Sequence, residues 1–284
     1  MSNSLVYKEE WSVKLQERLD EPTIWKEICR VDYTDTKTLH NPYLTDAAVQ
    51  TGTRGSAYTH QSITITDEEV SIDTYKILPQ LIDRADAAQC TYVNQMELAD
   101  SQGTLLNEDI ETAMLAQHAQ WTDFDNTEIG GSAGNITVAA SNIDDIIRAM
   151  KKKVRKAKGK SLARKNGMFI VWREEDFEIL EAYVQANGFN TADMALKNGI
   201  DDAFKYMGVE HYSSNFITAG HLFGGVKKVF HLGICKSTYG QIVIDEEPAT
   251  ADGAVSGTAV VSRVDYKFKA WNKTKPLIYD ILVA

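Results

Sequence analysis

Two neighbouring segments of the chain alternate apolar and polar side chains. In the first, Ile63 and Ile65 are separated by threonine, and in the second, Val70 and Ile72 are separated by serine. A period of two places successive side chains on opposite faces, so both segments are predicted to be half-buried strands. The acidic pair at 67–68 predicts a turn between them, which would make the two segments a hairpin.

A hairpin of this kind needs a further surface to cover its apolar side chains. Two-stranded hairpins are at best marginally stable alone in water. These side chains must therefore pack on the same chain or on a neighbouring copy, and the pattern leaves both open. Upstream, residues 51–56 are small, polar and rich in glycine, which predicts an irregular loop. Pro79 is expected to end the strand region, because proline cannot donate a ladder hydrogen bond.

A long helix is predicted next. From Tyr92 to Trp121, small or apolar residues recur at alternating steps of four and three, which keeps one stripe on one side of a helix. At 1.5 Å per residue this helix would be about 45 Å long, well above the usual 11–12 residues of a helix. Gly103 costs about 1 kcal/mol relative to alanine, so the pattern leaves open a kink or a break at that residue.

The remaining patterns predict a mixture of helices and strands. An apolar stripe between residues 143 and 154 predicts an amphipathic helix, and the continuous apolar run 168–172 predicts a buried central strand. Alternation around Val264 and the mostly apolar run 277–283 predict two closing strands. The elements do not follow a strict β-α-β order, so we expect a mixed α/β or α+β protein. Its length predicts about two domains, or one large α+β unit with excursions.

The composition is that of a soluble protein with a core of its own. Hydrophobic residues make up 43% of the 284 residues and charged residues 25%, which are ordinary values. Cys29, Cys90 and Cys235 lie far apart, which favours a reducing compartment over a disulfide framework. The N-terminal segment is unlike a secretory signal, and no apolar run reaches the about 20 residues that cross a bilayer. We therefore expect a cytoplasmic protein without a membrane partner.

The charge pattern has one local exception to an acidic balance. A net charge of −10 argues against a general nucleic-acid binder, which needs a basic surface to neutralise phosphates. Residues 148–165, however, hold ten of the 30 basic residues and no acidic residue. This run suits either a phosphate or acidic-partner contact, or a solvated helix face that complements the helix dipole. The candidate contact residues are Lys151, Lys152, Lys153, Arg155, Lys156 and Lys158.

No motif predicts an active site. The run 130–134 matches the Gly-x-Ser-x-Gly pattern of serine hydrolases, but that pattern works only between a strand and a helix, and neither flank has this character. His211, His221 and His231 recur every ten residues, a spacing that fits no common zinc pattern. We therefore expect no catalytic residue, no cofactor and no resident metal, and a hydrolase that uses Ser132 is the least favoured alternative.

Several stretches together resemble a known family. They are Ile63-Thr64-Ile65 with Val70-Ser71-Ile72-Asp73, residues 82–89 before the long helix, residues 110–115 near its end, and residues 208–215. With the order of elements around them, they resemble the major capsid protein of tailed bacteriophages, the Hong Kong 97-like coat protein family. The resemblance covers nearly the whole chain as a pattern of elements, and no single motif in it is diagnostic.

The resemblance implies an α+β, Hong Kong 97-like capsid fold in four parts. Residues 1–46 would be an N-terminal arm, 47–76 an extended loop over the neighbouring subunit, 77–127 with 251–284 a peripheral domain built on the spine helix, and 128–250 an axial domain. The implied function is structural, without enzymatic activity. Subunits would form pentamers and hexamers of an icosahedral head that encloses double-stranded DNA, assembled in the cytoplasm of a host bacterium and found in the virion.

The resemblance also implies contact residues and partners. Contacts between subunits are expected on the extended loop, at Arg54, Tyr58, Ile63, Ile65, Val70 and Ile72. Further expected partners are a portal, a decoration protein and packaged DNA held by non-specific contact. A separate scaffolding protein is expected as well, because no long extra segment precedes the arm. The alternative is an encapsulin-like compartment shell, which shares the fold but encloses enzymes.

The shell is predicted to be held without covalent bonds between subunits. Some members of the family cross-link their subunits through a lysine of the extended loop that attacks an asparagine of a neighbour. No lysine occurs between Asn41 and Tyr75. When mature particles are boiled in detergent, this chain should therefore migrate at the mass of one subunit, and a ladder of its cross-linked oligomers would contradict this prediction.

Overall fold

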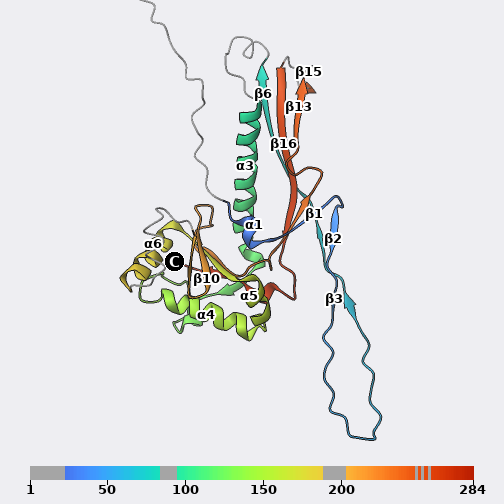
Figure 1. The fold of residues 1–284 in the computed structure, drawn as a ribbon, viewed down its shortest axis with the longest axis vertical. Coiled ribbons are helices and arrows are strands. Elements are labelled where there is room, and N and C mark those ends of the chain that lie inside the picture. Colours follow the sequence, from blue (N-terminus) through green and yellow to red (C-terminus); the bar gives the residue numbers. More distant parts are fainter. Residues whose placement is uncertain (1–22, 84–94, 188–202, 247–248, 251–252, 255–256) are drawn as a thin grey trace, which may run out of the picture.

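The computed structural model describes residues 23–83, 95–187, 203–246, 249–250, 253–254 and 257–284 of the chain. Figure 1 shows three parts: an upright helix beside long strands, a globular part at its foot, and a narrow arm that extends downward. Helices and strands follow no regular β-α-β order, as the α+β prediction requires. None of the described helices combines the length and the apolar character needed to cross a lipid bilayer.

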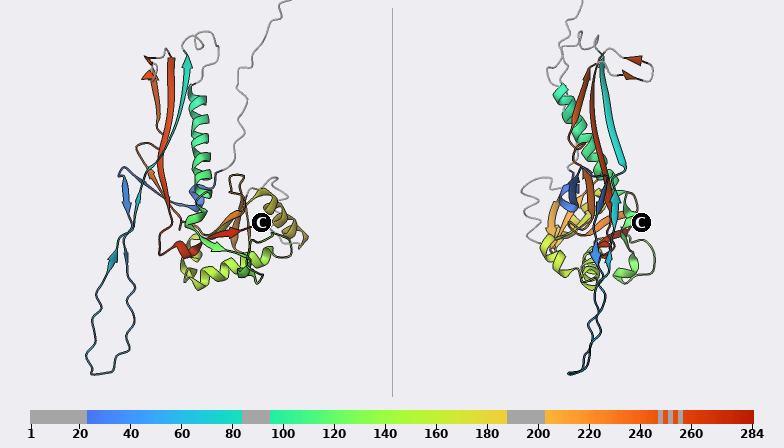
Figure 2. Two further views of the ribbon diagram at one scale, coloured as in Figure 1. Left: turned by 180° about the vertical axis from the view of Figure 1, so that it is seen from behind. Right: turned by 90° about the vertical axis from the view of Figure 1, so that its right-hand side faces the viewer.

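The upright part is the helix α3 lying against a five-stranded sheet (Figure 1, Figure 2). Its elements are β1 (Arg30–Thr34), β6 (Thr74–Asp83), α3 (Gln95–Leu115), β12 (His231–Cys235), β13 (Ile242–Glu246) and β16 (Gly257–Lys269). The central strand β16 pairs antiparallel with β6, β12 and β13. Alternate residues of β16 face α3, where Ser262 donates a hydrogen bond to Gln102 and Tyr266 donates one to Asp109. The alternation predicted around Val264 is therefore confirmed.

The long helix differs from its prediction at the C-terminal end. The apolar pattern predicts a helix that reaches residue 121, but the α-helix ends at Leu115 and a short 3-10 helix, η1 (His118–Gln120), follows. Residues 92–94 lie outside the described part of the chain. The helix continues through Gly103 without a break. The reason is tertiary packing: the neighbouring Gln102 is fully buried and its amide donates to both β6 and β16, which offsets the about 1 kcal/mol that glycine costs.

The strand β6 runs through Pro79, so the expectation that this proline ends the strand region is wrong. Pro79 lies opposite Val261 in the ladder between β6 and β16. Among the described strands, β6 pairs with β16 alone and so forms an edge. Proline is tolerated at a sheet edge because the missing N–H need not be part of a ladder there.

The arm is a two-stranded ribbon, but its pairing differs from the predicted hairpin. β2 (Thr38–His40) pairs antiparallel with β5 (Glu69–Ser71), and β3 (Tyr43–Leu44) pairs with β4 (Ile65–Thr66). The two alternating segments therefore pair with an upstream segment instead of each other, and the turn lies at residues 53–56 instead of 67–68. The prediction is wrong because alternation identifies a strand without identifying its partner.

The globular part is built on a six-stranded sheet in the order β7-β17-β11-β8-β10-β9. Its strands are β7 (Thr122–Phe124), β8 (Met168–Trp172), β9 (Ala203–Tyr206), β10 (Val209–Ser213), β11 (His221–Val226) and β17 (Ile278–Leu282). Its helices are η2 (Asn126–Ile129), α4 (Ile143–Lys156), α5 (Lys160–Asn166), α6 (Glu174–Ala186) and η3 (Lys275–Leu277), and a short pair elsewhere is β14 (Ala249–Thr250) with β15 (Gly253–Ala254). All five side chains of β8 are buried, which confirms the predicted central strand. The apolar stripe of α4 is buried too, and Met150 lies so close to Gly224 of β11 that a side chain there would meet its sulfur.

The upright and globular parts are joined at Glu111, near the foot of α3. This side chain is fully buried. Its Oε2 accepts the backbone N–H groups of Ile24 and Trp25, at 2.6 and 3.3 Å, where the short helix α1 (Trp25–Ile28) begins. Its Oε1 accepts the hydroxyl of Ser214, which follows β10, at 3.3 Å. A carboxylate suits these donors because the first N–H groups of a helix lack intrahelical partners.

Replacing Glu111 with alanine should lower the free energy of unfolding by about 3 kcal/mol, because three buried donors lose their acceptor. Urea unfolding followed by circular dichroism measures this change. Thr112→Ala is the matched control, since Thr112 is the exposed neighbour on the same helix, and it should change the free energy by less than about 0.5 kcal/mol. A Glu111→Ala variant as stable as the wild type would show that Glu111 does not hold the parts together.

Candidate functional site

The far end of the arm carries apolar side chains that the rest of the described chain leaves exposed. Every residue from 44 to 65 is exposed. The exposed fraction is 80% at Ile63, 76% at Tyr58 and 66% at Ile65. The side-chain amide of Gln61 exchanges two hydrogen bonds with the backbone across the ribbon, which holds the two sides together. Burying an apolar side chain of this size stabilises a complex by about 1.5–3 kcal/mol, so this surface suits a protein partner.

The six residues predicted for contacts between subunits divide into two groups. Exposed on the arm are Arg54, Tyr58, Ile63 and Ile65, and buried at its base are Val70 and Ile72. Ile72 packs beside Gly233 of β12, so the buried pair fastens the arm to its own sheet. Leu44 and Val49 are also exposed on the arm. Leu44 follows Tyr43 and Val49 follows two alanines, and neither lies in a stretch that alternates apolar and polar residues, so no periodic pattern marks them.

A second exposed apolar surface lies on the outer face of β6. Tyr75, Ile77 and Leu81 are each about half exposed, and they are spaced by two or four residues along the strand. The intervening Lys76 faces α3 instead, where its Nζ lies 2.9 Å from a carboxylate oxygen of Asp109. The sequence does not predict this surface, because the proline between Ile77 and Leu81 indicates the end of a strand, whereas β6 continues through it.

The basic residues of α4 and of the turn after it also form two groups, one that makes contacts within the chain and one that is exposed. The Lys151 ammonium donates to the carbonyl of Met207, and burial lowers the pKa of Lys151 below its usual value. The Lys153 ammonium lies 2.9 Å from a carboxylate oxygen of Glu128 and donates to the carbonyl of Asp123. These two lysines therefore make contacts within the chain. Exposed are Lys152, Arg155, Lys156 and Lys158.

The loop that contains Ser132 has no nucleophile-elbow geometry. Residues 130–135 are all exposed. They follow the short helix η2 and lead to Ile136, which forms an isolated parallel bridge with Val283. A nucleophile elbow needs a strand directly before the serine and a helix directly after it. The required order is absent on both sides of Ser132.

The three regularly spaced histidines do not meet. His211, His221 and His231 lie on β10, β11 and β12, and β12 belongs to the other large sheet. His231 Nε2 lies 2.7 Å from a carboxylate oxygen of Asp32. His211 is fully buried, and its Nδ1 accepts the indole N–H of Trp172 at 2.9 Å.

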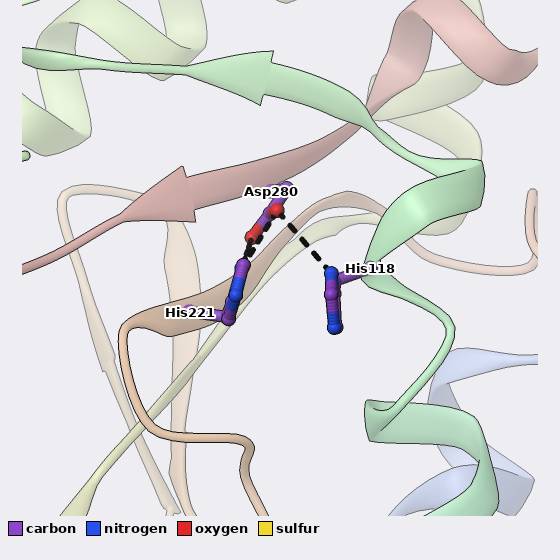
Figure 3. Close-up of side chains that lie close together, drawn as sticks. All are labelled: His118, His221 and Asp280. Atoms are coloured by element: carbon purple, nitrogen blue, oxygen red, sulfur yellow. Dashed lines mark hydrogen bonds and ion pairs between the residues drawn. The ribbon is translucent and has the colours of Figure 1, made fainter.

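His221 instead takes part in a different cluster, with His118 and Asp280 (Figure 3). His221 Nδ1 lies 2.8 and 3.0 Å from the two carboxylate oxygens of Asp280, and His118 Nδ1 lies 4.0 Å from the nearer one. The two imidazole rings stack with centroids 3.8 Å apart. The three residues come from η1, β11 and β17, far apart in sequence, so no motif predicts the cluster.

No protein-family model matches this sequence, and no curated protein matches it. Solved structures, however, match it over nearly its whole length. A chain from Mycobacterium phage Che8 matches with a TM-score of 0.73 and 16% identity, covering 99% of this chain and 98% of that one. A chain from the mature capsid of bacteriophage PhiM1 gives 0.69 and 12%, covering 98% and 92%. A chain of a virus-like particle from Pyrococcus furiosus gives 0.56 and 10%, covering 92% of each chain.

These matches confirm the predicted fold. The chain has the α+β, Hong Kong 97-like fold of phage capsid proteins. The predicted division at residues 46, 76, 127 and 250 stays a prediction. The ribbon pairing adds one fact to it, because residues 38–44 form one side of the arm and residues 65–71 the other.

His211 should make the stability of the fold depend on pH. Burial lowers the pKa of His211 to about 4, whereas a histidine in an unfolded chain titrates near 6.5. Between these values the unfolded chain binds more protons, so stability falls as the pH falls through this window. His211→Gln removes this titration. Between pH 6.5 and 4, the free energy of unfolding of the variant should therefore fall by up to about 3 kcal/mol less than that of the wild type. Urea unfolding at several pH values measures how the free energy of unfolding depends on pH in the wild type and in the variant. The same pH dependence in both would contradict the prediction.

Proposed function

We propose that this chain is the structural subunit of an icosahedral phage head, which assembles through pentamers and hexamers and encloses double-stranded DNA. The observation that carries the proposal is the arm, whose residues 44–65 are all exposed although several of them are large and apolar. A single subunit gains nothing from such an arm. The full-length likeness to chains of phage capsids supports the same conclusion.

The contact between copies is proposed to join two different surfaces of the subunit. One is the apolar end of the arm, at Tyr58, Ile63 and Ile65, and the other is the outer face of β6, at Ile77 and its neighbours. A contact between unlike surfaces repeats from copy to copy and closes into a ring when the rotation fits. Rings of five and six subunits follow this rule, so the two surfaces support a shell built from pentamers and hexamers.

The exposed basic residues are proposed to contact packaged DNA or a neighbouring subunit without sequence specificity. Phosphates attract lysine and arginine side chains whatever the base sequence. The subunit as a whole carries a net charge of −10, which keeps the shell from holding DNA tightly. A weakly attractive lining leaves DNA mobile during packaging and ejection.

A separate scaffolding protein, a portal and a decoration protein are the further partners of this proposal. Assembly would take place in the cytoplasm of a bacterial host, and the mature protein would reside in the virion. The function includes no catalytic step. The alternative is an encapsulin-like compartment shell: nucleic acid inside purified particles would support the phage head, and an enzyme that co-purifies inside them would support the compartment.

Single charged substitutions on the two surfaces should stop assembly without unfolding the subunit. Ile63→Asp on the arm and Ile77→Asp on β6 each place a carboxylate in the proposed apolar contact. Because both residues are exposed in the subunit, the free energy of unfolding should change by less than about 1 kcal/mol. Sedimentation velocity and electron microscopy measure assembly, and circular dichroism measures folding.

The matched control is Leu162→Asp on α5. Leu162 is also a partly exposed apolar residue, and it lies outside both proposed surfaces. This variant should form shells as the wild type does. Shells formed equally well by Ile63→Asp and Ile77→Asp would contradict the proposed contact.

A further inference from the structure

The cluster of His118, His221 and Asp280 has the donor set of a transition-metal site (Figure 3). Two imidazole nitrogens and one carboxylate oxygen are ligands that Zn²⁺ accepts, with a water in the fourth position. Ligands held about 2.0–2.1 Å from a tetrahedral ion lie about 3.3 Å from each other. Here Asp280 Oδ2 lies 2.8 Å from His221 Nδ1 and 4.0 Å from His118 Nδ1. One separation is therefore shorter and the other longer than the about 3.3 Å expected around a tetrahedral ion.

The fold places these donors together without help from an ion. His221 lies opposite Leu282 in the antiparallel pair of β11 and β17, and Asp280 is two residues from Leu282, so both side chains lie on the same face of the sheet. His118 approaches that face from η1. A second ring stack, Trp121 on Phe223 with centroids 3.8 Å apart, fixes the segment after η1 on the same strand.

Burial and access also suit a bound cation. The Asp280 side chain is almost completely buried, while those of His118 and His221 are 33% and 23% exposed. A buried carboxylate is unfavourable without a positive partner, and burial raises the pKa of Asp280, while His221 and His118 act in the opposite direction. Because both imidazole side chains are partly exposed, solvent and a dissolved ion can reach the cluster.

We propose that His118, His221 and Asp280 bind one Zn²⁺ ion or a similar transition-metal dication per subunit. Metal bonds lie in the plane of an imidazole, so His118 turns out of its stack on His221 to face the ion. Its exposure leaves room for this rotation. The bound ion ties the segment after α3 to β11 and β17, and so fastens the upright part of the subunit to the globular part. This site departs from the expectation of no resident metal that the sequence motifs suggested.

Cobalt is the direct probe, because tetrahedral Co²⁺ absorbs visible light where Zn²⁺ is silent. Protein first treated with a chelator should bind one Co²⁺ per subunit, Zn²⁺ should displace it, and Zn²⁺ should raise the midpoint of thermal unfolding.

His118→Gln and Asp280→Asn should each weaken binding by at least about 100-fold, since the loss of even an outer partner of a ligand weakens metal binding 10–100-fold. Circular dichroism in chelator checks that both variants fold, which is expected for Asp280→Asn because it preserves side-chain size.

His40→Gln is the matched control. His40 lies 2.6 Å from the Asp67 carboxylate on the exposed arm, so it has the same kind of pair without the third donor. This variant should bind Co²⁺ as the wild type does. No binding by the wild type, unchanged binding by a folded His118→Gln variant, or an equal loss in His40→Gln would each overturn the proposal.

Discussion

One buried carboxyl group, that of Glu111, holds the parts of this subunit in a fixed relation. It accepts hydrogen bonds from the start of α1 and from the segment after β10, while its own backbone belongs to α3. α1 leads directly into β1, and β1 lies in the same sheet as β6. Both sides of the arm therefore begin in a sheet whose position relative to the globular part depends on this joint.

The direction of the arm follows from that arrangement. A two-stranded ribbon is marginally stable alone, yet this one extends well away from the body of the subunit (Figure 1). Val70 and Ile72 are buried at its base, so the subunit holds the beginning of the ribbon and leaves the end uncovered. Such a division makes sense when a second copy covers the end. In the proposed assembly this division separates two requirements, because folding depends on the base and the contact with a second copy depends on the tip.

Local pattern predicts the elements of this chain well and their partners poorly. The buried strand at 168–172, the stripe of α4 and the alternation in β16 are confirmed because each depends on the period of its own residues. The hairpin pairing is wrong because the true partner, residues 38–44, has no pattern that points to residues 65–71. Pro79 predicts the end of a strand, but it lies inside β6 because that strand is a sheet edge. Gly103 leaves a break in α3 open, but the helix is continuous beside the buried, hydrogen-bonded Gln102.

The candidate sites show the same limit. Exposed arm residues such as Tyr58 and Ile63 could be named from the sequence because the family resemblance supplies a role for the loop. The outer face of β6 could not, since it requires the strand to continue past Pro79. The cluster at His118 requires three distant segments to meet, and only the register of β11 with β17 brings His221 beside Asp280.

The proposed function requires this chain to build a closed shell from copies of itself. Electron microscopy of the purified protein at high concentration, with mass measured by sedimentation, shows whether such shells form. We expect closed particles, or free rings of five and six copies, with a mass that is a multiple of 31.7 kDa. A folded protein that stays monomeric at every concentration and shows no particles would contradict it.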